Sequence, residues 1–213
     1  MNFEAVLFDC DGVLVDSEPI TNGALRECLH EAGWAITPED CERLFIGRAV
    51  RDQRALIEEM TGQPWSEAWL QAFYGRRNER LRAELKAIEG IHDAVAQLHG
   101  AVAGRLACAS GADLAKVKMQ LEQVDLARWF GAAVFSGHDL PRSKPAPDVY
   151  LAAAAHLGVD PTRCLVIEDT APGATAGLAA GATVWGFCPQ GHGRAFEGLP
   201  VARVFHHMRE LRL

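Results

Sequence analysis

The feature that most constrains the fold is a series of short, uninterrupted apolar runs spread along the 213-residue chain. Each run is too short for a helix, and none alternates apolar with polar residues. Such runs are typical of strands that are buried on both faces of a parallel sheet. The clear runs are residues 5–8, 106–109, 132–135, 164–167 and 182–185, and residues 203–205 form a weaker sixth run.

Helical patterns separate most of these runs. Apolar residues recur at helical spacing at Leu114, Val117, Leu121 and Val124, and a second stripe over residues 149–157 ends before Gly158. Strands that alternate with helices predict an α/β fold, here a three-layer sandwich around a parallel sheet.

Residues 17–88 break this alternation, because they carry helical patterns and no convincing strand. Three apolar stripes run through the segment, and one of them includes Ala55, Leu56 and Met60. We therefore expect a core domain formed by residues 1–16 and 89–213, and a helical domain over residues 17–88 inserted after the first strand. This insert is either a lid over a site at the strand ends or a purely structural elaboration.

Composition narrows the class of protein. Apolar residues make up 49% of the chain, which is enough for a sizeable core, and the net charge of −7 disfavours binding to nucleic acid or an anionic membrane. No apolar run is long enough to span a bilayer, and no basic region precedes an apolar stretch at the N-terminus. The six cysteines include no Cys-x-x-Cys pair, which favours reduced thiols. We expect a cytoplasmic protein.

The first strand ends in Asp9-Cys10-Asp11-Gly12. Two acids two residues apart in an extended segment point the same way, and such close like charges require a cation or a proton between them. Ligands of open α/β sheets bind just beyond the carboxyl ends of the strands. The alternatives are an Asp-Gly turn, a plain surface loop, or a calcium loop, although the twelfth position of a calcium loop would be Ile20 instead of an acid.

Polar residues also follow the other strands. Ser110 follows the second strand, Lys144 the third, and Glu168 with Asp169 the fourth. Ser110 suits a helix cap or a phosphate site at a helix N-terminus. Lys144 is either a solvated lysine or the counter-charge of an anion, and the two acids suit helix capping or a hard cation with oxygen ligands.

Together these motifs resemble the signatures of the haloacid dehalogenase (HAD) superfamily of phosphotransferases. Residues 9–18 are similar to its first signature, and Ser110, Lys144-Pro145 and Glu168-Asp169 match the second, third and fourth in order. The resemblance covers essentially the whole chain, and residues 17–88 match the helical cap of subfamily I. It implies a Rossmann-like core with five or six parallel strands.

The resemblance also implies a role for each matching residue. Asp9 would attack phosphorus to form an aspartyl phosphate, which water then hydrolyses. Asp11 would protonate the leaving alcohol and later deprotonate the water, so its pKa is expected to be raised. Ser110 and Lys144 would hold the phosphoryl oxygens.

A magnesium ion is the implied cofactor, held by the Asp9 carboxylate, the Asp11 carbonyl oxygen and Asp169, with Glu168 close by. A carboxylate that approaches a phosphate dianion at about 4 Å meets a repulsion of roughly 8 kcal/mol at an effective dielectric constant near 20. Mg²⁺ and Lys144 supply positive charge against this repulsion.

The most similar subgroup is that of the β-phosphoglucomutase-like proteins. Mutases of this type carry a cap histidine where this chain has Thr21, which favours a phosphatase over a mutase. True dehalogenases lack the acid at Asp11, and non-catalytic phosphate-binding regulatory relatives commonly lose an acid of the first signature. Residues 84–90, 135–139 and 187–189 are similar to bacterial phosphatases of sugar or sugar-acid phosphates, 6-phosphogluconate phosphatases among them.

Substrate-binding residues are expected in both domains. Arg48 or Arg51 could pair with a distal anionic group, because arginine binds carboxylate and phosphate well. The alternative for both is an exposed arginine at the start of a helix. Gly47, Ser17 and Gly111 complete the expected set. The expected partner is a small phosphate ester, and the expected oligomeric state is a monomer or weak dimer.

Overall fold

The computed structural model describes residues 3–45, 49–189 and 193–213. Gly47 and Arg48, both expected to bind substrate, lie outside the described residues. The chain divides into two compact units, Met1–Asp16 with Lys86–Leu213, and Ser17–Leu85.

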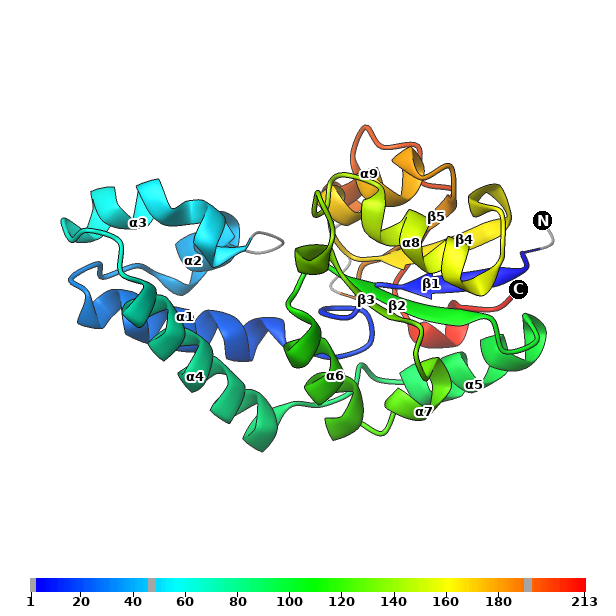
Figure 1. The fold of residues 1–213 in the computed structure, drawn as a ribbon, viewed down its shortest axis with the longest axis horizontal. Helices are drawn as coiled ribbons and strands as arrows, with labels where there is room; N and C mark the ends of the chain where they lie inside the picture. Colours follow the sequence, from blue (N-terminus) through cyan, green and yellow to red (C-terminus); the bar gives the residue numbers. More distant parts are fainter. Residues whose placement is uncertain (1–2, 46–48, 190–192) are drawn as a thin grey trace. The chain divides into compact units, whose positions relative to one another are not determined.

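The first unit contains a parallel six-stranded sheet in the order β3-β2-β1-β4-β5-β6 (Figure 1). All the apolar runs expected to form strands do so, including the weaker sixth. The strands are β1 (Ala5–Phe8), β2 (Leu106–Ser110), β3 (Val134–Ser136), β4 (Cys164–Glu168), β5 (Thr183–Phe187) and β6 (Arg203–Phe205). Because β1 lies between β2 and β4, the strand order reverses at β1, which is where such sheets bind ligands.

Helices cover both faces of this sheet. They are α5 (Ile91–Ala101), α6 (Leu114–Gln123), α7 (Ala127–Phe130), α8 (Asp148–Leu157) and α9 (Ala171–Ala179). In Figure 1, α8 and α9 cover one face, and α5, α6 and α7 lie on the other. Buried residues of the sheet such as Leu7 and Val166 pack with Ala153 of α8 and Ala174 of α9. The predicted three-layer Rossmann-like α/β fold is therefore confirmed.

Short 3₁₀ helices complete the first unit: η2 (Gly137–Asp139), η3 (Pro161–Arg163), η4 (Gly193–Phe196) and η5 (Met208–Glu210). All six cysteines are buried, and none forms a disulfide in the described chain. A search of the described helices finds none with the length and apolar character needed to cross a membrane.

In its described part, the second unit contains helices and their connections and no strand. It contains α1 (Glu18–Glu31), α2 (Pro38–Phe45), η1 (Val50–Gln53), α3 (Arg54–Thr61) and α4 (Glu67–Glu84). Its core includes Leu29 of α1 and Leu70 of α4, and the ion pairs Arg76–Glu31 (2.8 Å) and Arg80–Glu27 (2.7 Å) join the same helices.

The apolar stripe expected on α3 was wrong in detail. Leu56 packs half-buried against the core of this unit as expected, but Met60 is 46% exposed and the buried residue of the helix is Ile57. In a helix of only eight residues, the spacing of apolar residues does not identify which of them face the core.

Candidate active site

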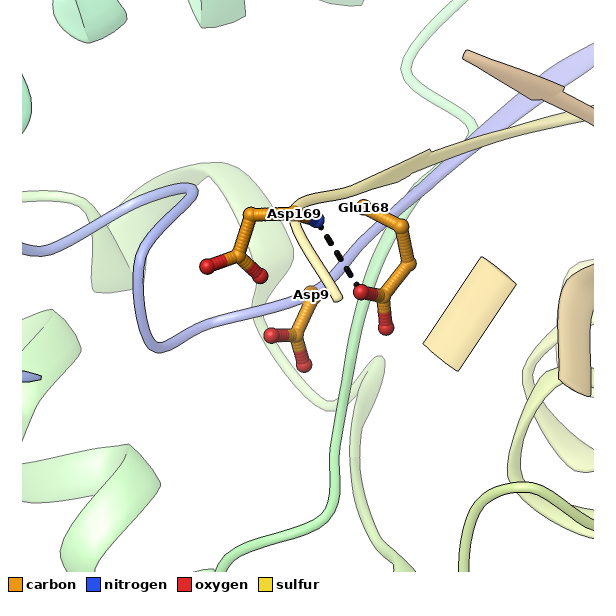
Figure 2. Close-up of side chains that lie close together, drawn as sticks. All are labelled: Asp9, Glu168 and Asp169. Atoms are coloured by element: carbon orange, nitrogen blue, oxygen red, sulfur yellow. Dashed lines mark hydrogen bonds between the residues drawn. The ribbon is translucent and has the colours of Figure 1, made fainter. Parts of the chain in front are cut away.

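Three carboxylates meet at the tips of two neighbouring strands. Asp9 follows β1, Glu168 is the last residue of β4, and Asp169 follows it. Because β1 and β4 pair in parallel, with Phe8 opposite Ile167, their carboxyl ends lie side by side. One oxygen from each acid lies within 4.8 Å of the others, and Figure 2 shows the three side chains converging.

Lys144 joins two of these acids. Its ammonium donates to Asp9 Oδ1 at 2.6 Å and to Glu168 Oε1 at 2.7 Å. All three side chains are almost or fully buried, so the contacts operate in a low-dielectric environment. The alternative of a solvated lysine is therefore wrong, because Lys144 is buried against carboxylates of the protein, and its contact with phosphoryl oxygens stays a prediction.

Glu168 is held by donors on both of its oxygens. Tyr150 Oη donates to Oε1 at 2.8 Å, beside the contact from Lys144. Oε2 accepts from the backbone N–H groups of Asp169 and Thr170, and from the Thr170 hydroxyl at 3.0 Å. This carboxylate is therefore already saturated, and its clearest role in the geometry is to hold Lys144.

A glycine leaves room for the Glu168 carboxylate. At Gly173, in the first turn of α9, an added Cβ would overlap the carboxylate of Glu168. The Gly173 N–H donates to Thr170 Oγ1 at 3.2 Å, so the start of α9 is built around this buried acid. Thr170 therefore caps α9 and binds Glu168 with the same hydroxyl.

The charge state of Asp9 depends on its surroundings. Burial raises the pKa of Asp9 from 3.8 to about 7, against the lowering effect of Lys144 and with a further raising effect of Glu168. Burial lowers the pKa of Lys144, but Asp9 and Glu168 together more than offset this, and the net pKa lies well above its usual value. Additional positive charge at this site would therefore favour ionised Asp9.

Asp11 is held by a different pair of residues. Lys116 Nζ donates to Asp11 Oδ1 at 2.8 Å and to Oδ2 at 2.9 Å, and Gln120 Nε2 donates to Oδ1 at 2.8 Å. Both partners lie on α6, one helical turn apart. These two residues were not predicted from the sequence, because a polar side chain beside the apolar stripe of α6 is normally solvated.

The loop that follows β1, over residues 9–15, is tightly folded. Gly12 has a φ of +80°, and a Cβ at this position would overlap the Asp169 carboxylate. The backbone N–H groups of Leu14 and Val15 both donate to the Cys10 carbonyl oxygen. The Asp-Gly pair thus turns the chain at the strand tip and leaves space for Asp169.

Ser110 is the last residue of β2 and is 1% exposed. Its hydroxyl accepts from the Ala112 N–H at 3.0 Å, in the loop that contains Gly111. The N-cap of α6 is instead Asp113, whose side chain accepts from the Lys116 N–H at 2.8 Å. The helix-cap alternative for Ser110 is therefore wrong.

Two further residues expected to bind substrate lie in the second unit. Ser17 is 1% exposed and precedes the first residue of α1. Arg51 belongs to η1, and its guanidinium pairs with Glu67 Oε2 at 3.2 Å, with both side chains more than half exposed. Substrate binding by either residue stays a prediction.

A comparison with known families identifies the family of this chain. A family model described as haloacid dehalogenase-like hydrolase matches residues 3–181. The chain belongs to this family. This HAD hydrolase is 30% identical to 6-phosphogluconate phosphatase of Escherichia coli (strain K12) over 209 residues, which cover 98% of the chain and 92% of that phosphatase.

Solved structures lead to the same assignment. A HAD family hydrolase from Deinococcus radiodurans R1, solved with bound phosphate and sodium, has a TM-score of 0.80 and 33% identity, covering 99% of this chain and 94% of that chain. A variant of CbbY from Rhodobacter sphaeroides, in complex with xylulose-(1,5)-bisphosphate, has a TM-score of 0.81 and 25% identity. The match covers 99% of this chain and 100% of that chain. The family predicted from the four signatures is confirmed.

Proposed function

We propose that this HAD hydrolase is a magnesium-dependent phosphatase of a small phosphorylated sugar or sugar acid, with Asp9 as its nucleophile. The observation that carries the proposal is the buried Asp9 carboxylate at the tip of β1, 2.6 Å from the Lys144 ammonium and clustered with Asp169. The matched relatives include 6-phosphogluconate phosphatase and hexitol phosphatase B of Escherichia coli, and this supports the substrate class.

The donor set fits a divalent cation. Three carboxylates converge and one ammonium faces them, so the cluster has an excess of two negative charges when all groups are ionised. Carboxylate oxygens are the ligands that a hard cation such as Mg²⁺ prefers. We infer that Asp9, Asp169 and the Asp11 carbonyl oxygen would hold the ion, while Glu168 holds Lys144. When bound, Mg²⁺ neutralises charge on the transferring phosphoryl oxygens.

The chain's own residues perform the steps. An Asp9 carboxylate oxygen attacks phosphorus and the bond to the leaving oxygen breaks, while Asp11 gives that oxygen its proton. Lys144 offsets the negative charge that the phosphoryl group brings beside Asp9. Ser110 and the backbone N–H groups near the start of α6 would hold the phosphoryl oxygens.

The second half of the cycle restores the enzyme. Asp11, now ionised, takes a proton from a water molecule, whose oxygen attacks phosphorus of the aspartyl phosphate. The bond between phosphorus and the Asp9 oxygen breaks, and phosphate is released. Asp9 returns as a carboxylate and Asp11 regains the proton that it gave to the leaving alcohol.

A phosphate-release screen tests this function. Sugar, sugar-acid and glycolytic phosphates would be offered with Mg²⁺ and, separately, with a chelator, to the wild type and to Asp9→Asn. We expect turnover of a sugar or sugar-acid phosphate that the chelator removes and that Asp9→Asn abolishes. Activity retained by Asp9→Asn would mean that the nucleophile is misassigned.

With glucose 1,6-bisphosphate added, we expect no isomerisation of glucose phosphates, because Thr21 stands at the position of the mutase histidine.

A further inference from the structure

Two buried donors on one face of α6 converge on the Asp11 carboxylate. Lys116 contacts both carboxylate oxygens, and Gln120 donates to Oδ1. Lys116 is 6% exposed and Gln120 is fully buried. Neither residue belongs to the four family signatures, and neither takes part in the steps proposed for Asp9 and Asp11.

The burial of these groups needs an explanation. Removing an ammonium or an amide from water costs several kcal/mol unless each finds strong partners. Gln120 uses both ends of its amide, because Nε2 donates to Asp11 while Oε1 accepts from the Cys10 thiol at 3.7 Å. The amide thus bridges the two residues that directly follow Asp9.

The position of α6 is itself well defined. Asp113 caps its N-terminus, and Val117 and Leu121 are fully buried on the same side of the helix. Residues four apart on a helix lie on one face, so Lys116 and Gln120 reach Asp11 from a single rigid element. The Asp11 side chain is therefore restrained from outside its own loop.

We propose that Lys116 and Gln120 are positioning residues that set the orientation of the Asp11 carboxylate for proton transfer, both to the leaving oxygen and from the attacking water. This inference rests on the proposed roles of Asp9 and Asp11. A general acid must lie within about 2.6–3.2 Å of the atom it protonates, and a misplacement of about 1 Å costs on the order of a hundredfold in rate. Without the two donors, the Asp11 side chain can adopt other staggered rotamers.

The dependence of kcat/KM on the leaving group distinguishes a positioning role of Lys116 and Gln120 from a merely structural one. Phenolate is the more basic leaving group and depends strongly on a proton from the acid, whereas p-nitrophenolate is less basic and depends on it much less. Loss of Asp11 positioning should therefore lower kcat/KM for phenyl phosphate much more than for p-nitrophenyl phosphate. General damage to the fold or to phosphate binding would lower both values equally.

The experiment compares these two substrates, with Mg²⁺ present, for the full-length wild type, Lys116→Met and Gln120→Leu. We expect the ratio of kcat/KM for phenyl over p-nitrophenyl phosphate to fall about tenfold in each variant. Lys118→Met is the matched control, because Lys118 is an exposed lysine on the same helix and should leave the ratio unchanged. Lys116→Arg keeps a buried cationic donor and should give an intermediate ratio even if Lys116→Met folds poorly.

Asp11→Asn distinguishes failure of this inference from failure of the proposed function. If Asp11→Asn lowers the ratio but the Lys116 and Gln120 variants leave it at the wild-type value, the positioning role is refuted and the general acid stands. If Asp11→Asn itself leaves the ratio unchanged, Asp11 is not the acid, and both this inference and the acid role proposed for Asp11 fall, while the role of Asp9 as nucleophile is tested separately by Asp9→Asn.

Discussion

At the scale of single residues, the site concentrates buried charge. Lys144 bridges Asp9 and Glu168 within 2.7 Å, and Lys116 contacts both oxygens of Asp11. Each ammonium has a carboxylate partner, which offsets much of the cost of burial. The balance is incomplete at Asp9, whose pKa is raised to about 7 by burial.

We therefore predict that the stability of Asp9→Asn relative to the wild type rises with pH in the metal-free protein. Because the pKa of Asp9 is 3.8 when unperturbed and about 7 in the fold, the stability that protonated Asp9 contributes is full below about pH 4 and is lost as the pH rises through 7. The asparagine does not titrate. Urea unfolding with chelator should show the variant gaining about 2–3 kcal/mol over the wild type between pH 5 and pH 8.

A constant difference between the two proteins across this pH range would contradict the raised pKa of Asp9. The surface variant Asp160→Asn serves as a control. Hydrogen bonds from Thr162 lower the pKa of this exposed acid, so its substitution should not change stability with pH between about pH 5 and pH 8. A gain of this kind would be expected if Asp9, the proposed nucleophile, is held in its reactive position at a cost to stability.

At the scale of elements, α9 begins around a buried carboxylate. Gly173 lies in its first turn, where a Cβ would overlap Glu168, and Thr170 caps the helix while it also binds Glu168. The fourth signature is therefore both the start of a helix and the support of Lys144. A change in the backbone here should affect stability and activity together.

We predict that Gly173→Ala destabilises the protein by about 2 kcal/mol or more and lowers kcat, because the Glu168 carboxylate must shift and release donors. Gly100→Ala in α5 is the matched control, since a Cβ there meets nothing within 4 Å. Alanine at that helical position should stabilise the protein by about 0.5–1 kcal/mol. Equal effects of the two substitutions on thermal unfolding would refute this account of Gly173.

A second prediction at this scale concerns Arg51 of η1. Its ion pair with Glu67 is largely exposed, and such pairs contribute at most about 1 kcal/mol, so the guanidinium can exchange Glu67 for a substrate carboxylate. Arg51→Ala should raise KM for 6-phosphogluconate about tenfold and leave KM for p-nitrophenyl phosphate unchanged.

Arg54→Ala is the control for this test, because Arg54 is also exposed and pairs with Glu58. An unchanged KM for the sugar-acid phosphate in Arg51→Ala, or an equal rise in both arginine variants, would remove Arg51 from the predicted substrate-binding set.

At the scale of the whole molecule, metal binding and folding should be coupled through the strand-tip acids. The three carboxylates come from two strand ends that are distant in sequence, so they form a site only in the folded chain. A cation that binds the folded state alone raises the stability of the fold. A proton on Asp9 competes with that cation.

We predict that a fixed concentration of Mg²⁺ raises Tm more at pH 8 than at pH 6. Asp9 has a pKa of about 7 without the metal, so below this pH the cation must displace a proton to bind. The apparent affinity for Mg²⁺ therefore falls by up to about tenfold per pH unit below about 7. Thermal unfolding with Mg²⁺ and with chelator measures the difference. Asp169→Asn should remove the gain at both pH values, whereas a gain that does not change with pH would exclude Asp9 as a ligand.

The sheet and the family could be predicted from local sequence patterns. Strands buried on both faces leave a local trace of apolar runs, and all six runs became strands. The ends of parallel strands share one edge, so the acids after β1 and β4 were expected to meet, and Asp9, Glu168 and Asp169 do. Local pattern and topology are sufficient for this part of the site.

The partners of these acids could not be predicted from the sequence, because they come from distant parts of the chain. Lys116 reaches Asp11 across 105 positions of the chain, and Tyr150 donates to Glu168 across 18. A lysine or tyrosine on a helix has the same local sequence signal whether its head meets water or a buried carboxylate. The difference depends on how α6 and α8 pack against the strand tips, which is a property of the folded chain and not of any single segment.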